Sequence, residues 1–179
     1  MPHYSVDKPV PAQWSVKQGL TSYLEENGFS REEYDLPVVK VTFWGITFPV
    51  PNPPQRQIAV RFHDLHHLVT GYGTDPTGEA EISAWEMRRG VSVFGLYVQG
   101  IVFVGMLMGF VHSPRRTLRA WQTAKSKTPL VPTTMDRYQE LLKLSVGELR
   151  QLYDVPQGAL ADKPRRLHDK APQVNTESK

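Results

Sequence analysis

The chain has 179 residues, of which 40% are hydrophobic and 22% charged, and its formal net charge is +3 at pH 7. This size and composition predict one domain with a hydrophobic core, and so small a positive charge gives no indication of nucleic-acid binding. The chain contains no cysteine, which excludes disulfides, thiolate zinc sites and thiol catalysis. Because the N-terminal segment is polar and contains prolines, we expect no secretory signal and a location in a bacterial cytoplasm.

The first predicted helix covers residues 14–27, with Gly28 as the glycine that ends it. Ser30 and Glu33 then have the spacing of a capping box, and Pro37 allows only a short helix after them. These elements belong to an all-α fold, which we predict to be a single compact helical domain.

Residues 38–55 are rich in proline, so we expect an extended arm draped over the helices. Val39, Val41 and Phe43 alternate with polar or smaller residues as in a strand. The partners that such a strand would need are missing from the predicted elements, so no sheet is expected.

Residues 56–90 are predicted to form two helices joined by a short turn rich in glycine. On the first helix, His63 and His67 are four positions apart and project from one face. Asp64 points about 100° away from His63 around the helix, still close enough to ligate or orient.

The turn at residues 71–76 ends the first of these helices and begins the second, with Asp75 or Thr77 as the N-cap. Glu79 then falls in the first turn of the second helix, where the helix dipole favours a carboxylate. Two imidazoles and one or two carboxylates at this hairpin predict a divalent-metal site, although a His pair at this spacing is also common in buried clusters without metal. Neither the HExxH motif of metalloproteases nor the ExxH motif of di-iron carboxylate proteins is present.

These ligands favour Zn, Fe, Co or Mn as the divalent metal and leave coordination positions open for water or substrate. Asp64 or Glu79 could serve as a catalytic base instead of a ligand, and their spacing does not decide between the two roles.

Residues 91–111 contain no charged side chain and reach the length of a membrane span. Basic residues on both sides and four glycines favour a long apolar central helix, buried in the core and broken near Gly100. Gly105 and Gly109 have GxxxG spacing, which allows neighbouring backbones to approach closely. Gly105 and Met106 could instead line an apolar slot for a ligand.

The following segment, residues 112–127, is basic and includes Trp121. A basic amphipathic helix of this kind suits the surface of an anionic membrane, or is an ordinary solvated face. Arg115 and Arg116 are candidate ligands for a phosphate or carboxylate, because the guanidinium fork matches both groups.

Two short helices are predicted at residues 135–144 and 146–153, with Ser145 as the cap between them. The sequence therefore divides into a helical domain at 1–155 and a flexible polar tail at 156–179.

The hairpin motif, His63-Asp64-Leu65-His66-His67 followed by Glu79, resembles the signature of the coenzyme Q (ubiquinone) biosynthesis protein 4 family. The flanking residues agree with this resemblance: Arg61, Thr74, Asp75, Gly78 and Trp85. It implies an all-helical fold in which His63, Asp64, His67 and Glu79 bind a divalent ion. His66 stands where many members of that family carry an apolar residue, which leaves room for a further ligand.

The resemblance also implies a polyprenylated benzoate or quinone precursor as ligand, and oxidative decarboxylation of its ring, with hydroxyl replacing carboxyl. A non-catalytic lipid-binding scaffold that organises other quinone-biosynthesis enzymes is the alternative. In both cases we expect peripheral association with a membrane surface, and a homodimer is plausible. A metal-dependent phosphohydrolase is a third hypothesis, suggested only by the adjacent His63 and Asp64.

Overall fold

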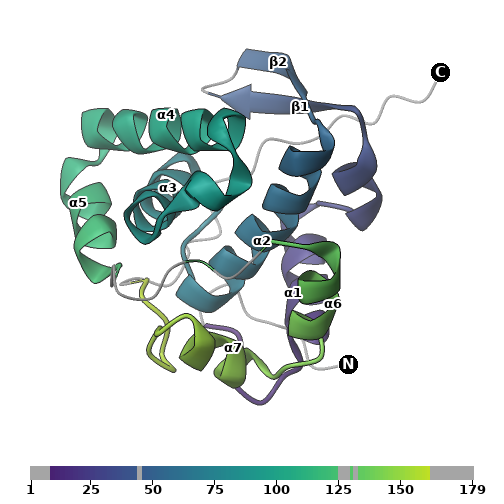
Figure 1. Cartoon of the computed structure of the whole chain (residues 1–179). Helices are drawn as coiled ribbons and strands as arrows, with labels where there is room; N and C mark the ends of the chain where they lie inside the picture. Colours follow the sequence, from purple (N-terminus) through teal and green to yellow (C-terminus); the bar gives the residue numbers. More distant parts are fainter. Residues whose placement is uncertain (1–8, 44–45, 125–129, 131–132, 162–179) are drawn as a thin grey trace.

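The computed structural model describes residues 9–43, 46–124, 130 and 133–161 (Figure 1). Helices predominate, and the described elements follow in this order: α1 (Val16–Asn27), η1 (Arg31–Asp35), β1 (Val38–Phe43), β2 (Ile46–Pro51), α2 (Pro54–Thr70), α3 (Pro76–Arg89), η2 (Val91–Phe94), α4 (Leu96–His112), α5 (Pro114–Thr123), α6 (Met135–Leu141) and α7 (Val146–Leu152).

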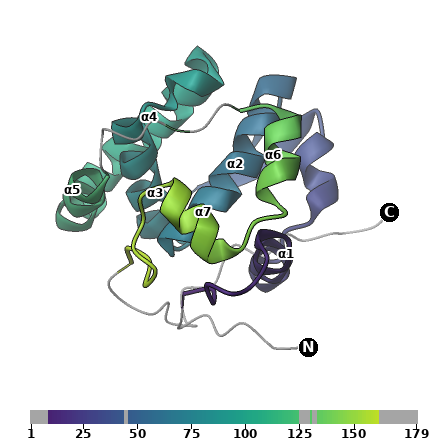
Figure 2. The ribbon, with the colours of Figure 1, turned by 60° about the horizontal axis from the view of Figure 1, so that its bottom comes forward.

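Helix α2 is the central element of the fold. It contacts α1, α6 and α7 on one side and α3 and α4 on the other, as the two views in Figures 1 and 2 show. Phe62, Leu65 and Val69 are completely or almost completely buried along α2. Their burial anchors the hydrophobic core, because apolar surface removed from water is the main source of folding free energy.

Several helix ends follow the sequence prediction. Helix α1 begins after Ser15, whose side chain forms a capping box with Gln18, and it ends at Gly28 with a φ of 69°. Ser145 likewise forms a capping box at the start of α7. The capping box predicted at Ser30 was wrong, because the Ser30 side chain makes no capping hydrogen bond and the segment is a 3₁₀ helix.

The prediction that residues 38–55 lack a sheet partner was also wrong. β1 pairs with β2 as an antiparallel hairpin in which Val38 lies opposite Pro51. The partner strand was overlooked because it contains Pro49 and Pro51. In a sheet of two strands each strand is an edge, where a residue without an N–H is tolerated.

The long apolar central helix predicted at residues 91–111 is absent. The chain forms η2, breaks at Gly95 with a φ of 85°, and continues as α4, which lies on the surface. The break is at Gly95 and not near Gly100. No described helix is long and apolar enough to cross a membrane.

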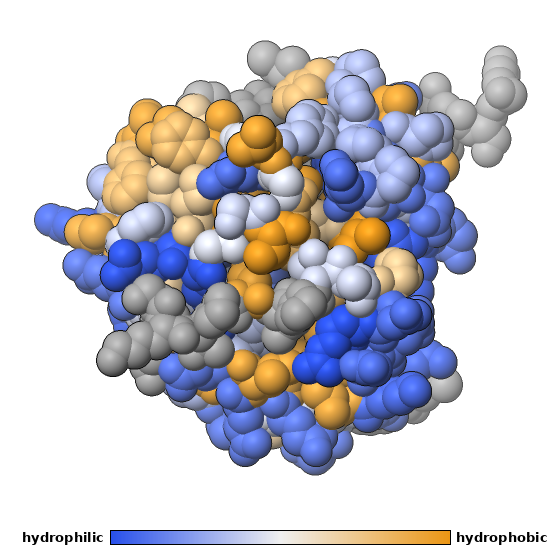
Figure 3. All heavy atoms as spheres, viewed as in Figure 1, coloured by the Kyte–Doolittle hydropathy of each residue, from blue (hydrophilic) through white to orange (hydrophobic). Residues whose placement is uncertain are grey.

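Helix α4 buries only a narrow stripe and exposes the rest of its apolar side chains. The stripe at Val98, Val102 and Met106 faces inward, and Figure 3 shows apolar side chains gathered over this part of the surface. The exposed apolar residues of α4 are Leu96, Tyr97, Ile101, Phe103, Val104, Leu107, Phe110 and Val111, and we call them the α4 apolar face. Most of the apolar side chains of α4 therefore form an exposed surface and not a buried core.

The predicted close approach at the GxxxG pair is confirmed. A methyl group at Gly105 would lie 2.6 Å from Ser83 Oγ, and one at Gly109 would lie 2.5 Å from Ala80 Cβ. Helices α3 and α4 therefore pack with their backbones close together at both glycines.

The predicted tail is packed at its start. The amides of Leu160 and Ala161 donate to the carbonyl of Thr70 at 2.8 and 3.2 Å, and Leu160 packs against the core. Residues 162–179 lie outside the described part of the chain.

Candidate metal site

The end of α2, a short turn and the start of α3 build the candidate site. Gly71 ends α2 in the left-handed region with a φ of 75°. Asp75 then caps α3, because its side chain accepts hydrogen bonds from the amides of Thr77 and Gly78. The backbone of Gly73 lies where a side chain at position 78 would be, so the glycine at that position lets the turn close against α3 and fixes Glu79 opposite α2.

Three of the predicted residues converge at this hairpin: His63, His67 and Glu79. The two Nε2 atoms of the histidines are 3.0 Å apart. The Glu79 carboxylate lies 3.4 Å from Nε2 of His63 and 3.5 Å from Nε2 of His67. Ligand atoms held about 2.0–2.2 Å from one metal ion are separated by about 2.9 Å at a right angle and about 3.4 Å in a tetrahedron, so the group could hold a metal ion with little rearrangement.

The outer nitrogens of both imidazoles are bound to acceptors. Nδ1 of His67 donates to the carbonyl of Tyr72 at 3.0 Å, and Nδ1 of His63 donates to Oε1 of Glu86 at 2.9 Å. Since a carbonyl and a carboxylate accept hydrogen bonds, Nδ1 of each imidazole carries a proton. Once His63 has lost its second proton, the Nε2 lone pair of each neutral ring faces the centre of the site. Partners of this kind orient metal-binding histidines.

Sequence reasoning missed Glu86, although helical spacing indicates it. Glu86 follows Glu79 by seven positions, so both carboxylates lie on the same face of α3. Glu86 is 2% exposed, and its Oε1 also accepts a 2.7 Å hydrogen bond from Nδ1 of His66.

Interactions within the group favour a protonated His63 beside ionised Glu79 and Glu86. Burial alone would lower the pKa of His63, but Glu86 and Glu79 together raise it well above its usual value. Burial would raise the pKa of Glu79, but His67 and His63 lower it to about 2. The same competition between burial and the neighbouring His63 and His66 places the pKa of Glu86 well below its usual range. Both carboxylates are therefore ionised at neutral pH.

The site opens to solvent on one side. The side chains of Glu79 and His63 are 42% and 26% exposed, whereas that of His67 is 1% exposed. Tyr23 of α1 stacks on the His67 ring from the buried side, with the ring centres 5.8 Å apart. A bound ion would thus keep room for water or another ligand on the Glu79 side.

Asp64 and His66 lie outside the group of three converging residues and have other partners. Asp64 Oδ2 accepts a short hydrogen bond from the Tyr34 hydroxyl, and burial raises the pKa of this carboxyl. His66 is completely buried between the rings of Trp85 and Tyr153. Neither residue belongs to the group whose ligand atoms lie within 4.8 Å of one another.

The other predicted ligand-binding residues lie in the packing of α3, α4 and α5. Arg116 pairs with Glu81, with N–O distances of 2.6 and 2.9 Å, and Arg115 is exposed on α5. Met106 is buried and Gly105 packs against Ser83. In the part of the chain that the structure describes, no hydrogen bond or ion pair joins these four residues to the histidine group.

Comparisons with protein-family models, with curated proteins and with solved structures gave no match to this chain.

Proposed function

We propose that this chain binds one divalent cation through His63, His67 and Glu79. The observation that carries the proposal is that their ligand atoms converge while Tyr72 and Glu86 hold the outer sides of the two imidazoles. Two histidines and one carboxylate, with open positions, form the ligand set that non-haem Fe(II) oxygenases use. The same ligand set also holds catalytic Zn, so the choice of Fe(II) ahead of Co, Mn and Zn rests on the oxidative reaction proposed for the site.

The proposed ligand is a polyprenylated benzoate or quinone precursor, as the motif resemblance implies. An ion bound on the open side of the site would bind the carboxylate or phenolate oxygens of the ring and act as a Lewis acid. Oxidative decarboxylation replaces the ring carboxyl with a hydroxyl: the acid, dioxygen and water give the phenol, carbon dioxide and hydrogen peroxide. Dioxygen is therefore the required oxidant, which agrees with the preference for Fe(II).

The α4 apolar face supports peripheral association with a membrane. Leu96 and Val111 at its two ends are 87% and 73% exposed, and apolar patches of this kind on soluble proteins mark interaction surfaces. The adjoining helix α5 carries Arg115, Arg116 and Arg119. An apolar face beside arginines suits a bilayer that contains anionic lipids, from which a prenylated ligand could be taken.

The test is single-turnover release of labelled carbon dioxide from a prenylated 4-hydroxybenzoate labelled in its carboxyl carbon. Full-length protein would be loaded with Fe(II), Co(II), Mn(II) or Zn(II) in the presence of dioxygen. We expect release with Fe(II), and loss of release in Glu79→Ala. Metal binding without release under any of these conditions would refute the enzymatic part and favour the scaffold alternative.

A further inference from the structure

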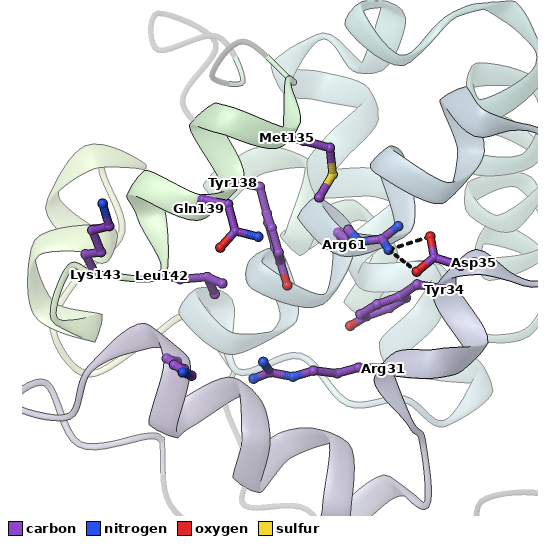
Figure 4. Close-up of a pocket in the computed structure, with 10 residues that line it drawn as sticks. Arg31, Tyr34, Asp35, Arg61, Met135, Tyr138, Gln139, Leu142 and Lys143 are labelled. Carbon is purple, nitrogen blue, oxygen red and sulfur yellow. Dashed lines mark hydrogen bonds and ion pairs between the residues drawn. The ribbon is translucent and has the colours of Figure 1, made fainter.

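A second candidate site lies in a cleft between α1, η1, α2 and α6, separate from the histidine group (Figure 4). Its volume is ≈ 420 Å³, which is within the range of small-molecule pockets and exceeds the needs of a single inorganic ion. The residues that line it are Lys17, Arg31, Tyr34, Asp35, Arg61, Met135, Tyr138, Gln139, Leu142 and Lys143.

The lining carries an excess of positive charge. Its single carboxylate, Asp35, accepts two hydrogen bonds of 2.8 Å from Arg61. The other three cations, Lys17, Arg31 and Lys143, form no ion pair with a carboxylate within the described residues. A concave surface lined by one sign of charge concentrates ions of the opposite sign.

Arg31 is held in a position to bind a ligand. One of its Nη atoms donates to Thr21 Oγ1 of α1 at 2.9 Å, which fixes the guanidinium and leaves its remaining N–H groups for another acceptor. Figure 4 shows the Arg31 side chain extended along the cleft, below the hydroxyl of Tyr138.

Tyr138 provides a further hydrogen-bond donor in the cleft. The residue is only 4% exposed, and its hydroxyl points into the cleft without a hydrogen-bond partner among the described residues (Figure 4). The hydroxyl oxygen itself is open to the cleft, where an oxygen of a bound anion could accept its hydrogen bond.

We propose that this cleft binds a phosphate group carried by a small organic molecule. Arg31 and Tyr138 donate hydrogen bonds to the phosphate oxygens, and Lys17 and Lys143 neutralise its second charge. Three cations without a carboxylate partner among the described residues match a phosphate dianion better than a carboxylate ligand. Met135 and Leu142 provide apolar contacts for the organic part. The proposal does not depend on metal binding, because none of the three metal-binding residues lines the cleft.

The test is isothermal titration of the full chain with phenyl phosphate, inorganic phosphate and benzoate at constant ionic strength. Each titration is done with and without EDTA, so that binding through a metal ion is recognised by its loss. We expect saturable binding of phenyl phosphate that EDTA does not affect, with weaker binding of inorganic phosphate and much weaker binding of benzoate. Equal affinity for benzoate would overturn the phosphate assignment.

Substitutions in the cleft test whether phenyl phosphate binds there. Arg31→Gln should weaken phenyl phosphate binding about tenfold or more, and Tyr138→Phe about threefold to tenfold, as expected for hydrogen bonds to a charged ligand. Lys40→Ala, which removes one exposed positive charge from β1, outside the cleft, is the matched control and should have no effect. Equal weakening in all three variants would mean nonspecific charge attraction and would overturn the proposal. Vesicles containing phosphatidic acid distinguish a lipid headgroup, which would bind with the same variant pattern, from a soluble phosphate ester.

Discussion

Replacing Glu86 by glutamine tests whether this residue prepares His63 for a metal ion. The change keeps the shape of the side chain but removes the charge that accepts hydrogen bonds from His63 and His66 at 2.9 and 2.7 Å. Loss of such a partner usually reduces metal affinity about 10- to 100-fold, equivalent to about 1.4–2.7 kcal/mol.

The size of this effect should depend on pH. Glu86 raises the pKa of His63, so in the parent a proton competes with the metal at low pH. Glu86→Gln lowers that pKa, which weakens the competition and partly offsets the loss of orientation. We therefore expect the full loss of affinity near pH 8 and a smaller one near pH 6.

Competition titrations with a chromophoric chelator would measure these affinities, with circular dichroism as the fold control. Glu81→Gln is the matched control, since Glu81 is also a buried carboxylate on α3 but pairs with Arg116. It should leave metal affinity unchanged. A folded Glu86→Gln protein with parental affinity at pH 8 would refute the role assigned to Glu86.

Three further predictions concern pH, packing and membrane binding. Because the pKa of His63 is raised, metal binding near pH 7 should release about one proton, measurable by calorimetry in buffers of different ionisation enthalpy. In the protein without metal, the free energy of unfolding should fall as pH rises from about 6.5 through that raised pKa. Gly109→Ala should destabilise the fold by about 1–3 kcal/mol in urea unfolding, because the added methyl group would overlap side chains of α3 and α5. Gly100→Ala is the control: no neighbouring atom lies within 4 Å of its methyl group, so it should stabilise the fold by about 0.5–1 kcal/mol. The double variant Val104→Asp and Val111→Asp should abolish co-flotation with anionic vesicles without lowering the melting temperature, since both residues are exposed; unchanged flotation would contradict the membrane proposal.

The helix hairpin could be predicted from sequence because its signals are local. Histidines four apart share a helix face, and Asp75 and Gly71 mark where one helix begins and the other ends. These rules place Glu79 near the two imidazoles without any knowledge of the remaining fold.

The partner of Asp64 and the burial of residues 91–111 depend on contacts between residues far apart in the sequence, which helix spacing and capping do not specify. Asp64 is bound by Tyr34, thirty positions earlier in the chain, and no spacing rule connects the two. The apolarity of 91–111 is compatible with a core helix, a membrane span or an exposed face. Only the packing of α3 against α4 through Gly105 and Gly109 decides that one stripe is buried.

The central claim is that His63, His67 and Glu79 form one divalent-metal site, and elemental analysis of protein purified without a metal-binding tag tests it most directly. The parent would be compared with His63→Ala and Glu79→Ala, each with a circular dichroism spectrum. The account predicts about one divalent ion per parent chain and a loss of that ion in both folded variants. A parent chain that holds no ion and takes up none on titration with Fe(II), Co(II), Mn(II) or Zn(II) would contradict it.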